Sequence, residues 1–116
     1  MNIVVSGIHL EQFPEMEAYA KKKVAKLEKF HSKIEKINVR LISQKAHREK
    51  EQDYYCEIDI DIPGRNIEIV DVEGAMDKAI DKATERAKRI LIKYKEKKIT
   101  KQHQEGILIK LKNRLF

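Results

Sequence analysis

YYCEIDIDI, residues 54–62, alternates apolar with acidic side chains along almost its whole length. Because successive side chains of a strand point to opposite faces of a sheet, this pattern predicts a strand with one buried and one solvated face. The predicted inward side chains are Tyr54, Cys56, Ile58, Ile60 and Ile62, and the outward ones are Tyr55, Glu57, Asp59 and Asp61. We therefore expect helices to cover the apolar face alone.

Three further strands are predicted around this stretch. Residues 2–7 are rich in β-branched side chains, and residues 34–42 (IEKINVRLI) place Ile37, Val39 and Leu41 in alternation. A polar run, residues 43–52, connects the second and third strands as a loop or the loose end of a hairpin. Pro63, Gly64, Arg65 and Asn66 predict a turn, and residues 67–72 a fourth strand.

Two amphipathic helices are predicted from apolar residues at helical spacing. The first begins at Pro14, which suits a first helical turn, and runs for about 20 residues. Its apolar stripe is Met16, Ala20, Val24, Leu27, His31 and Ile34. The second covers about residues 74–98, with the stripe Met76, Ala79, Ile80, Ala83, Ala87, Ile90, Leu91 and Tyr94.

The element order is β-α-β-β-β-α. A strand, a helix and a strand predict a right-handed parallel crossover, and the next two strands continue as an antiparallel meander. The fold class is therefore α+β: a two-layer sandwich in which two helices pack on one face of a four-stranded mixed sheet. We expect one domain, residues 1–98, and a C-terminal tail, residues 99–116. The tail could fold back, self-associate with another chain, or lack fixed structure; its apolar residues are Ile107, Leu108, Ile109, Leu111, Leu115 and Phe116.

Composition favours a polyanion partner. The net charge is +6, the pI is about 9.4, and 38% of residues are charged. No apolar run approaches the roughly 20 residues of a membrane span, and the N-terminus does not resemble a secretory signal. Cys56 is the only cysteine, which fits a reducing cytosol, so we expect a cytoplasmic protein without membrane contact.

The charges are sorted by face. At about 100° per residue, one arc of the second helix, beside its apolar stripe, collects six basic residues, whereas Asp77, Asp81 and Glu85 fall on the opposite flank. That arc holds Lys78, Lys82, Arg86, Arg89, Lys93 and Lys97. On the first helix the arc is Lys22, Lys26, Lys29 and Lys33, with Lys23 nearer the apolar edge. Residues 53–73 instead carry seven acidic residues against Arg65 alone.

Basic helices over an acidic sheet predict that a structured RNA binds the helices and is recognised by shape, because phosphate contacts do not read sequence. The ordinary alternative is a solvated pair of surface helices. His9, His31, His47 and His103 lack metal-ligand spacing, and no phosphate-binding glycine motif is present. The alternating sheet carboxylates are typical of a solvated face. We therefore expect no enzyme, no cofactor, no metal and no small-molecule substrate.

Residues 20–34 (AKKKVAKLEKFHSKI) and 78–97 (KAIDKATERAKRILIKYKEK), in this strand order, resemble the family of ribosome hibernation-promoting factor and ribosome-associated inhibitor A, once called sigma-54 modulation proteins. The resemblance covers about residues 1–98 and is to the short form. It implies a factor of stress or stationary phase that binds 16S rRNA of the small ribosomal subunit, in the mRNA channel and tRNA sites near the decoding centre, and silences translation. The positions that match the family's basic pattern are Lys23, Lys26, Lys33, Arg86, Arg89, Lys93, Lys95 and Lys97.

The chain departs from the family pattern in three places. Phe13-Pro14 stands where Thr-Pro is usual, and Ala75-Met76-Asp77 replaces Asp-Met-Tyr. Residues 99–116 match neither the long form's dimerisation domain nor the short forms, which leaves open whether the protein promotes or opposes pairing of whole ribosomes. A general double-stranded RNA-binding module and a domain that docks an acidic protein are the alternative functions.

Overall fold

The computed structural model describes residues 2–7, 14–45 and 52–103. Along the chain the elements are β1 (Asn2–Gly7), α1 (Pro14–Ala25), the 3₁₀ helix η2 (Lys26–Phe30), β2 (Lys36–Lys45), β3 (Gln52–Ile62), β4 (Arg65–Glu73) and α2 (Met76–His103). The strands form one sheet in the order β1-β2-β3-β4. β1 pairs parallel with β2, and the other two pairings are antiparallel, so the predicted β-α-β-β-β-α sandwich is confirmed.

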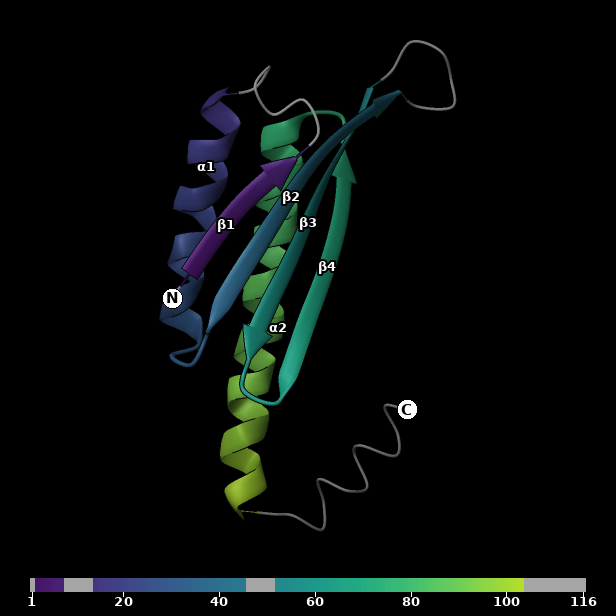
Figure 1. Cartoon of the computed structure of the whole chain (residues 1–116). Helices are drawn as coiled ribbons and strands as arrows, with labels where there is room; N and C mark the ends of the chain where they lie inside the picture. Colours follow the sequence, from purple (N-terminus) through teal and green to yellow (C-terminus); the bar gives the residue numbers. More distant parts are fainter. Residues whose placement is uncertain (1, 8–13, 46–51, 104–116) are drawn as a thin grey trace.

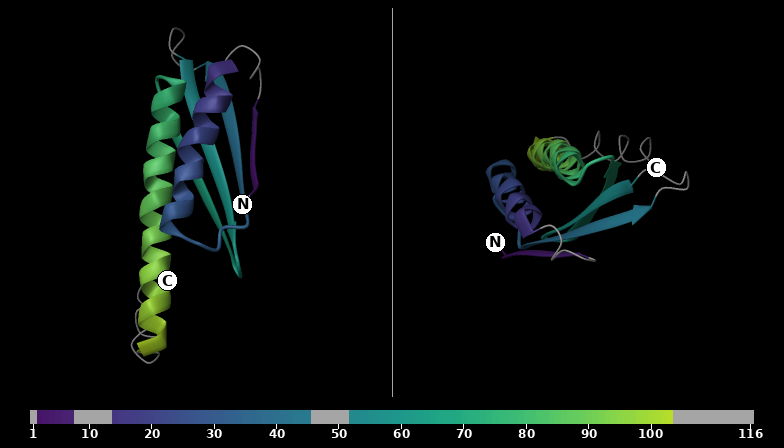
Figure 2. Two further views of the ribbon diagram at one scale, coloured as in Figure 1. Left: turned by 90° about the vertical axis from the view of Figure 1, so that its left-hand side faces the viewer. Right: turned by 90° about the horizontal axis from the view of Figure 1, so that it is seen from above.

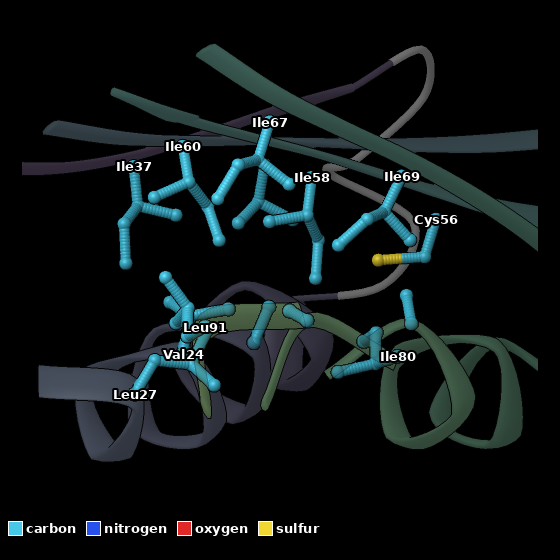
Figure 3. Close-up of a cluster of buried hydrophobic side chains, with 14 of the residues drawn as sticks. Val24, Leu27, Ile37, Cys56, Ile58, Ile60, Ile67, Ile69, Ile80 and Leu91 are labelled. Carbon is cyan, nitrogen blue, oxygen red and sulfur yellow. The ribbon is translucent and has the colours of Figure 1, made fainter. Parts of the chain in front are cut away.

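Both helices lie on one face of the sheet (Figure 2). β3 alternates as its sequence predicts, since Cys56, Ile58, Ile60 and Ile62 are buried and Tyr54 packs partly buried against them. Side chains of the helices meet this row from the other layer (Figure 3), among them Val24, Leu27, Ile80 and Leu91. Full burial of one such aliphatic side chain contributes roughly 1.5–3 kcal/mol, so this layer contact is the main stabilising feature of the fold.

The turn between β3 and β4 is tighter than the sequence suggests. Ile62 pairs with Arg65, so only Pro63 and Gly64 lie between the strands, and β4 begins two residues before the predicted strand. Gly64 has φ +77, a left-handed conformation that is strained for any residue with a Cβ. Proline followed by such a glycine is typical of a type II turn.

The first helix is shorter than predicted. Regular α-helix ends at Ala25, the chain tightens into η2, and His31 is extended with φ −157 and ψ 116. The reason is tertiary: β2 starts at Lys36 beside β1, with the Asn2 N–H donating to Glu35 O at 3.3 Å, so the chain must leave the helix early. Ile34 is still buried, 7% exposed, but it lies in the connection and not on the helix.

The second helix begins at Met76 and continues to His103, across the predicted boundary at residue 98. Residues 104–116 lie outside the described residues, so the division into a domain and a tail stays a prediction. The predicted connection at residues 43–52 is shorter, since residues 43–45 belong to β2 and Gln52 begins β3. Its remainder, residues 46–51, and His9 also lie outside the described residues. Within the described residues, no helix is long and apolar enough to cross a membrane, and no group of three metal-ligating side chains occurs.

Candidate RNA-binding surface

α1 and α2 run side by side in the same direction (Figures 1 and 2). Near their starts, the Tyr19 hydroxyl donates a hydrogen bond to Asp81 Oδ1, and Lys23 Nζ lies 3.2 Å from the same oxygen. The hydrogen bond to Asp81, together with desolvation and the charges of Asp81 and Asp77, raises the pKa of Tyr19 to about 12. The acidic flank of α2 therefore faces α1.

The basic arc of α2 faces the other way, over the edge of the sheet at β4. Lys82 Nζ lies 3.6 Å from Glu73 Oε1, and Arg86 Nη2 lies 2.9 Å from Asp71 Oδ1. We call Lys78, Lys82, Arg86, Arg89 and Lys93 the edge stripe; successive members are three or four residues apart and share one side of the helix. Near the start of α2, the acidic flank therefore separates the edge stripe from the lysines of α1.

Asp71 holds Arg86 in place. Asp71 takes an inward position of β4, in alternation with Ile67 and Ile69, and its side chain is only 3% exposed. Its Oδ2 is buried and has no hydrogen-bond partner within the described residues. Removing one partner of a buried pair leaves an uncompensated charge and costs roughly 3–5 kcal/mol. Arg86, itself 52% exposed, is therefore anchored by one nitrogen while its other N–H groups can reach outward.

Asp71 also affects the Cys56 thiol and the exposed edge of β4. Cys56 pairs in register with Asp71, and burial, followed by the charges of Asp71 and Glu57, raises the pKa of the Cys56 thiol to about 12. β4 is also an edge strand of the sheet. An inward-pointing charge on an edge strand discourages pairing with another chain.

η2, which carries Lys26 and Lys29, contacts α2 further along its length. In a 3₁₀ helix side chains at i and i+3 eclipse, so Lys29 falls in line with Lys26. Lys88 Nζ lies 5.0 Å from the centroid of the Phe30 ring, which brings η2 and α2 together. Lys88 and Lys95 follow Asp81 at intervals of seven residues, so this flank of α2 changes from acidic to basic along its length. Because these two elements meet at the contact between Lys88 and Phe30, we call their lysines Lys26, Lys29, Lys88 and Lys95 the junction cluster.

Lys88 was missed by the sequence analysis, which followed the outer arc alone. The heptad that joins Asp81, Lys88 and Lys95 was the available signal. Lys33 does not belong to the first helix as predicted, since it lies in the turn after η2, where its N–H donates to His31 Nδ1 at 3.2 Å. The Lys33 side chain is exposed. Because η2 ends at Phe30, Lys33 does not lie on the helical arc predicted for it.

The predicted RNA-binding residues fall into two groups. Lys23, Lys82, Arg86 and Arg89 make ion pairs, the last with Glu85 at 3.8 Å. Seven others are exposed and make no ion pair with another described residue: Lys22, Lys26, Lys29, Lys33, Lys78, Lys93 and Lys95. Lys97 lies on α2, but its side chain is outside the description. Exposed ion pairs contribute about 0–1 kcal/mol, so Lys82 and Arg89 can exchange a carboxylate for a phosphate at small cost.

The opposite face of the sheet would repel phosphate. Its outward side chains on β3 include Glu57, Asp59 and Asp61, as predicted. The Asn66 amide donates hydrogen bonds to Asp59 Oδ1 and, at 2.6 Å, to Asp61 Oδ1. Asp59 and Asp61 thus already accept hydrogen bonds, and Glu57 Oε2 lies 3.9 Å from Arg40 Nη1. Acidic side chains predominate on this face, so the basic helices form the candidate RNA-binding surface.

Comparison with known proteins points to one family. Residues 3–99 match the family model described as sigma 54 modulation protein / S30EA ribosomal protein. A ribosomal subunit interface protein from Coxiella burnetii is similar in structure, with a TM-score of 0.70 and 20% identity, over 83% of this chain and 99% of its own. The N-terminal domain of Thermus thermophilus Protein Y is similar with a TM-score of 0.63 and 24% identity, over 81% and 99%. No curated protein sequence matches the chain.

Proposed function

Because the chain belongs to the sigma 54 modulation protein / S30EA ribosomal protein family, we propose that it is a ribosome hibernation factor. It binds the small ribosomal subunit through 16S rRNA, in the mRNA channel and tRNA sites near the decoding centre. Its binding stabilises inactive ribosomes in the cytoplasm under stress or in stationary phase. We propose no catalytic residue, cofactor, metal or small-molecule substrate for it.

The segregation of charge between the two faces carries this proposal. The edge stripe and the junction cluster present exposed lysines on the helical layer, while Glu57, Asp59 and Asp61 occupy the other face. A surface of this kind gains affinity for RNA by releasing counterions from phosphates. It also fixes which side of the molecule faces the RNA, because the acidic side would be repelled.

Arg86 and the exposed lysines have different roles in this proposal. The lysines are flexible point charges that add affinity with little geometric demand. The guanidinium of Arg86 is fixed by Asp71 at 2.9 Å, so a phosphate must come to it in one place. Planar, bidentate contact between arginine and phosphate adds geometric selectivity. The pair therefore favours a folded RNA with a phosphate at that position over an arbitrary duplex.

Co-sedimentation tests the proposed function. The protein should travel with small subunits and whole ribosomes in a sucrose gradient at low salt, leave them as salt rises, and inhibit translation in vitro. A protein that stays at the top of the low-salt gradient would refute ribosome binding. Equal affinity for an arbitrary RNA duplex and for the small subunit would instead identify a general double-stranded RNA-binding module.

A further inference from the structure

The face of the sheet opposite the helices, here the open face, changes character along the strands. Near the turn between β3 and β4 it carries three carboxylates, Asp59, Asp61 and Glu68, against one basic residue, Lys36, which lies opposite Asp61 on β2. Further along, Glu57 lies opposite Val70 and Tyr55 opposite Val72. Val70 and Val72 are 53% and 41% exposed, unusually high values for valines in the middle of a strand. From the turn toward the other end of β3 and β4, the open face thus changes from acidic to apolar within a few residues.

Alternate residues from Lys110 to Phe116 have the same order of properties with the opposite charge. Residues 107–109 are apolar, Lys110, Lys112 and Arg114 then alternate with Leu111 and Asn113, and Leu115 and Phe116 follow. Glu105 is the only acidic residue of 104–116. In an extended chain Lys110, Lys112, Arg114 and Phe116 share one side, which is basic first and then aromatic. That order is complementary to the open face, which is acidic near the turn and apolar further from it.

The reach of the chain fits this match. Arg65 lies 4.5 Å from the centroid of the Tyr94 ring, so Tyr94 is level with the turn between β3 and β4. α2 runs on to His103, past that end of the sheet (Figure 1), by about nine residues or roughly 13 Å. With layers roughly 10 Å apart, six or so extended residues of about 3.3 Å each lead back to the open face. Lys110 would then arrive near Asp61.

We propose that residues 107–116 pack onto the open face of the same chain. Extended chains rise equally per residue, so the register that starts with Lys110 at Asp61 continues with Lys112 near Asp59 and Glu68. Arg114 then lies near Glu57, where it joins Arg40, whose Nη1 is 3.9 Å from Glu57 Oε2, and Phe116, on the same side of the extended chain as Lys110, Lys112 and Arg114, reaches Val70 and Val72. The tether to α2 gives the segment a high effective concentration, which favours the same chain over a second copy.

The edge of β4 is the less favourable place for this segment. A strand added there would bring Lys110, Lys112 and Arg114 beside the edge stripe, which is also basic. Like charges at close range repel, and the inward charge of Asp71 already discourages pairing at this edge. The open face offers carboxylates and exposed valines together, so it is the surface that the segment fits.

A spin label on the segment tests the proposal in the full chain. Asn113 is changed to Cys and labelled with a nitroxide; Cys56 is buried, and a parallel reaction of the parent protein measures any labelling there. The amide and methyl signals of Glu68, Val70 and Val72 should lose most of their intensity and recover when the nitroxide is reduced. Signals of Lys22 and Arg89, on the helical layer, should keep theirs.

A charge swap supplies the matched control. E68K in the labelled chain should reduce the loss of intensity at Val70 and Val72, and adding K112E should restore it. Unchanged intensities at Val70 and Val72 in the labelled parent chain would overturn the proposal, as would losses confined to the helical layer. If the losses appear only between a labelled chain and a separate isotope-labelled copy, the segment packs on a second molecule, and packing within one chain is refuted.

This inference does not rest on the proposed function. The spin-label experiment uses isolated protein without RNA, so its failure leaves ribosome binding untouched. Conversely, a protein that does not sediment with ribosomes can still show the predicted loss of signal at the open face.

Discussion

Arg86 Nη2 lies 2.9 Å from Asp71 Oδ1, and this ion pair joins α2 to the edge strand of the sheet. Asp71 occupies a position that Ile67 and Ile69 would predict to be apolar. Its burial makes it dependent on Arg86, whereas Arg86 keeps enough exposure to contact a second anion. One pair thus links the stability of the fold to the geometry of the proposed RNA-binding surface.

Replacing Arg86 by Met should destabilise the protein by about 3 kcal/mol, the lower end of the range for a broken buried pair, because Arg86 itself is half exposed. The double variant D71V/R86M should recover most of this loss, since it removes both charges. Urea unfolding measures both free energies, and R89M, which breaks only an exposed pair, should cost less than about 1 kcal/mol. Equal losses for R86M and R89M would show that Asp71 does not depend on Arg86.

Lys93→Gln should weaken binding to the small subunit and lower the slope of log affinity against log salt by about 0.7–0.9, the value for one lost phosphate contact. Lys93 is exposed and makes no ion pair with another described residue. Lys21→Gln is the control, because Lys21 pairs with Glu17 at 3.7 Å on another side of α1. Filter binding over a range of salt concentrations gives both slopes; an unchanged slope for Lys93→Gln would remove it from the surface.

Tyr19 should titrate near pH 12 because its hydroxyl donates to Asp81 and the neutral form is favoured. A pKa that is higher in the folded state contributes stability that is fully present below about pH 10 and is lost as pH rises through about 12. Absorbance of tyrosinate at alkaline pH, with Tyr19→Phe subtracted, gives this midpoint. D81N should move it down towards 10. A midpoint near 10 in the parent protein would show that the contact between Tyr19 and Asp81 is absent in solution.

Cys56 should react slowly with a disulfide reagent at neutral pH, because burial and the charge of Asp71 hold its pKa at about 12 and leave little thiolate. Denaturant should make the reaction fast, and R86M should accelerate it by loosening the contact above Asp71. The release of the coloured thiol follows the rate. A fast reaction in the native protein would mean that the thiol is accessible from solvent.

The strands and the layer arrangement follow from local sequence patterns. The alternation from Tyr54 to Ile62 sets the inward face of β3, and the structure buries Cys56, Ile58, Ile60 and Ile62 accordingly. The spacing of Met76, Ala79, Ile80, Ala83, Ala87 and Leu91 likewise predicts the buried side of α2. Such patterns are sufficient to predict the buried face of an element whose inward side chains recur at a regular spacing.

What the sequence did not reveal depends on contacts between distant elements. The change from α-helix to 3₁₀ helix after Ala25 is imposed by the place where β2 must start. The residue types of 26–30 do not predict this change. Asp71 can point inward because it forms an ion pair with Arg86, which lies 15 positions further along the chain. Lys88 is placed by Phe30. In each case a partner far along the chain decides the position of the side chain.

Two charge-reversed variants give the most direct test of the central claim, that the basic helical layer binds the small ribosomal subunit. K78E/K93E reverses two exposed residues of the edge stripe, and K21E/K36E reverses the same number of charges elsewhere. The dissociation constant for purified small subunits, measured at one fixed salt concentration, should rise at least about 100-fold for K78E/K93E, or about 2.7 kcal/mol. It should change less than about threefold for K21E/K36E. Equal losses in the two variants would contradict the account, because net charge alone would then explain the binding.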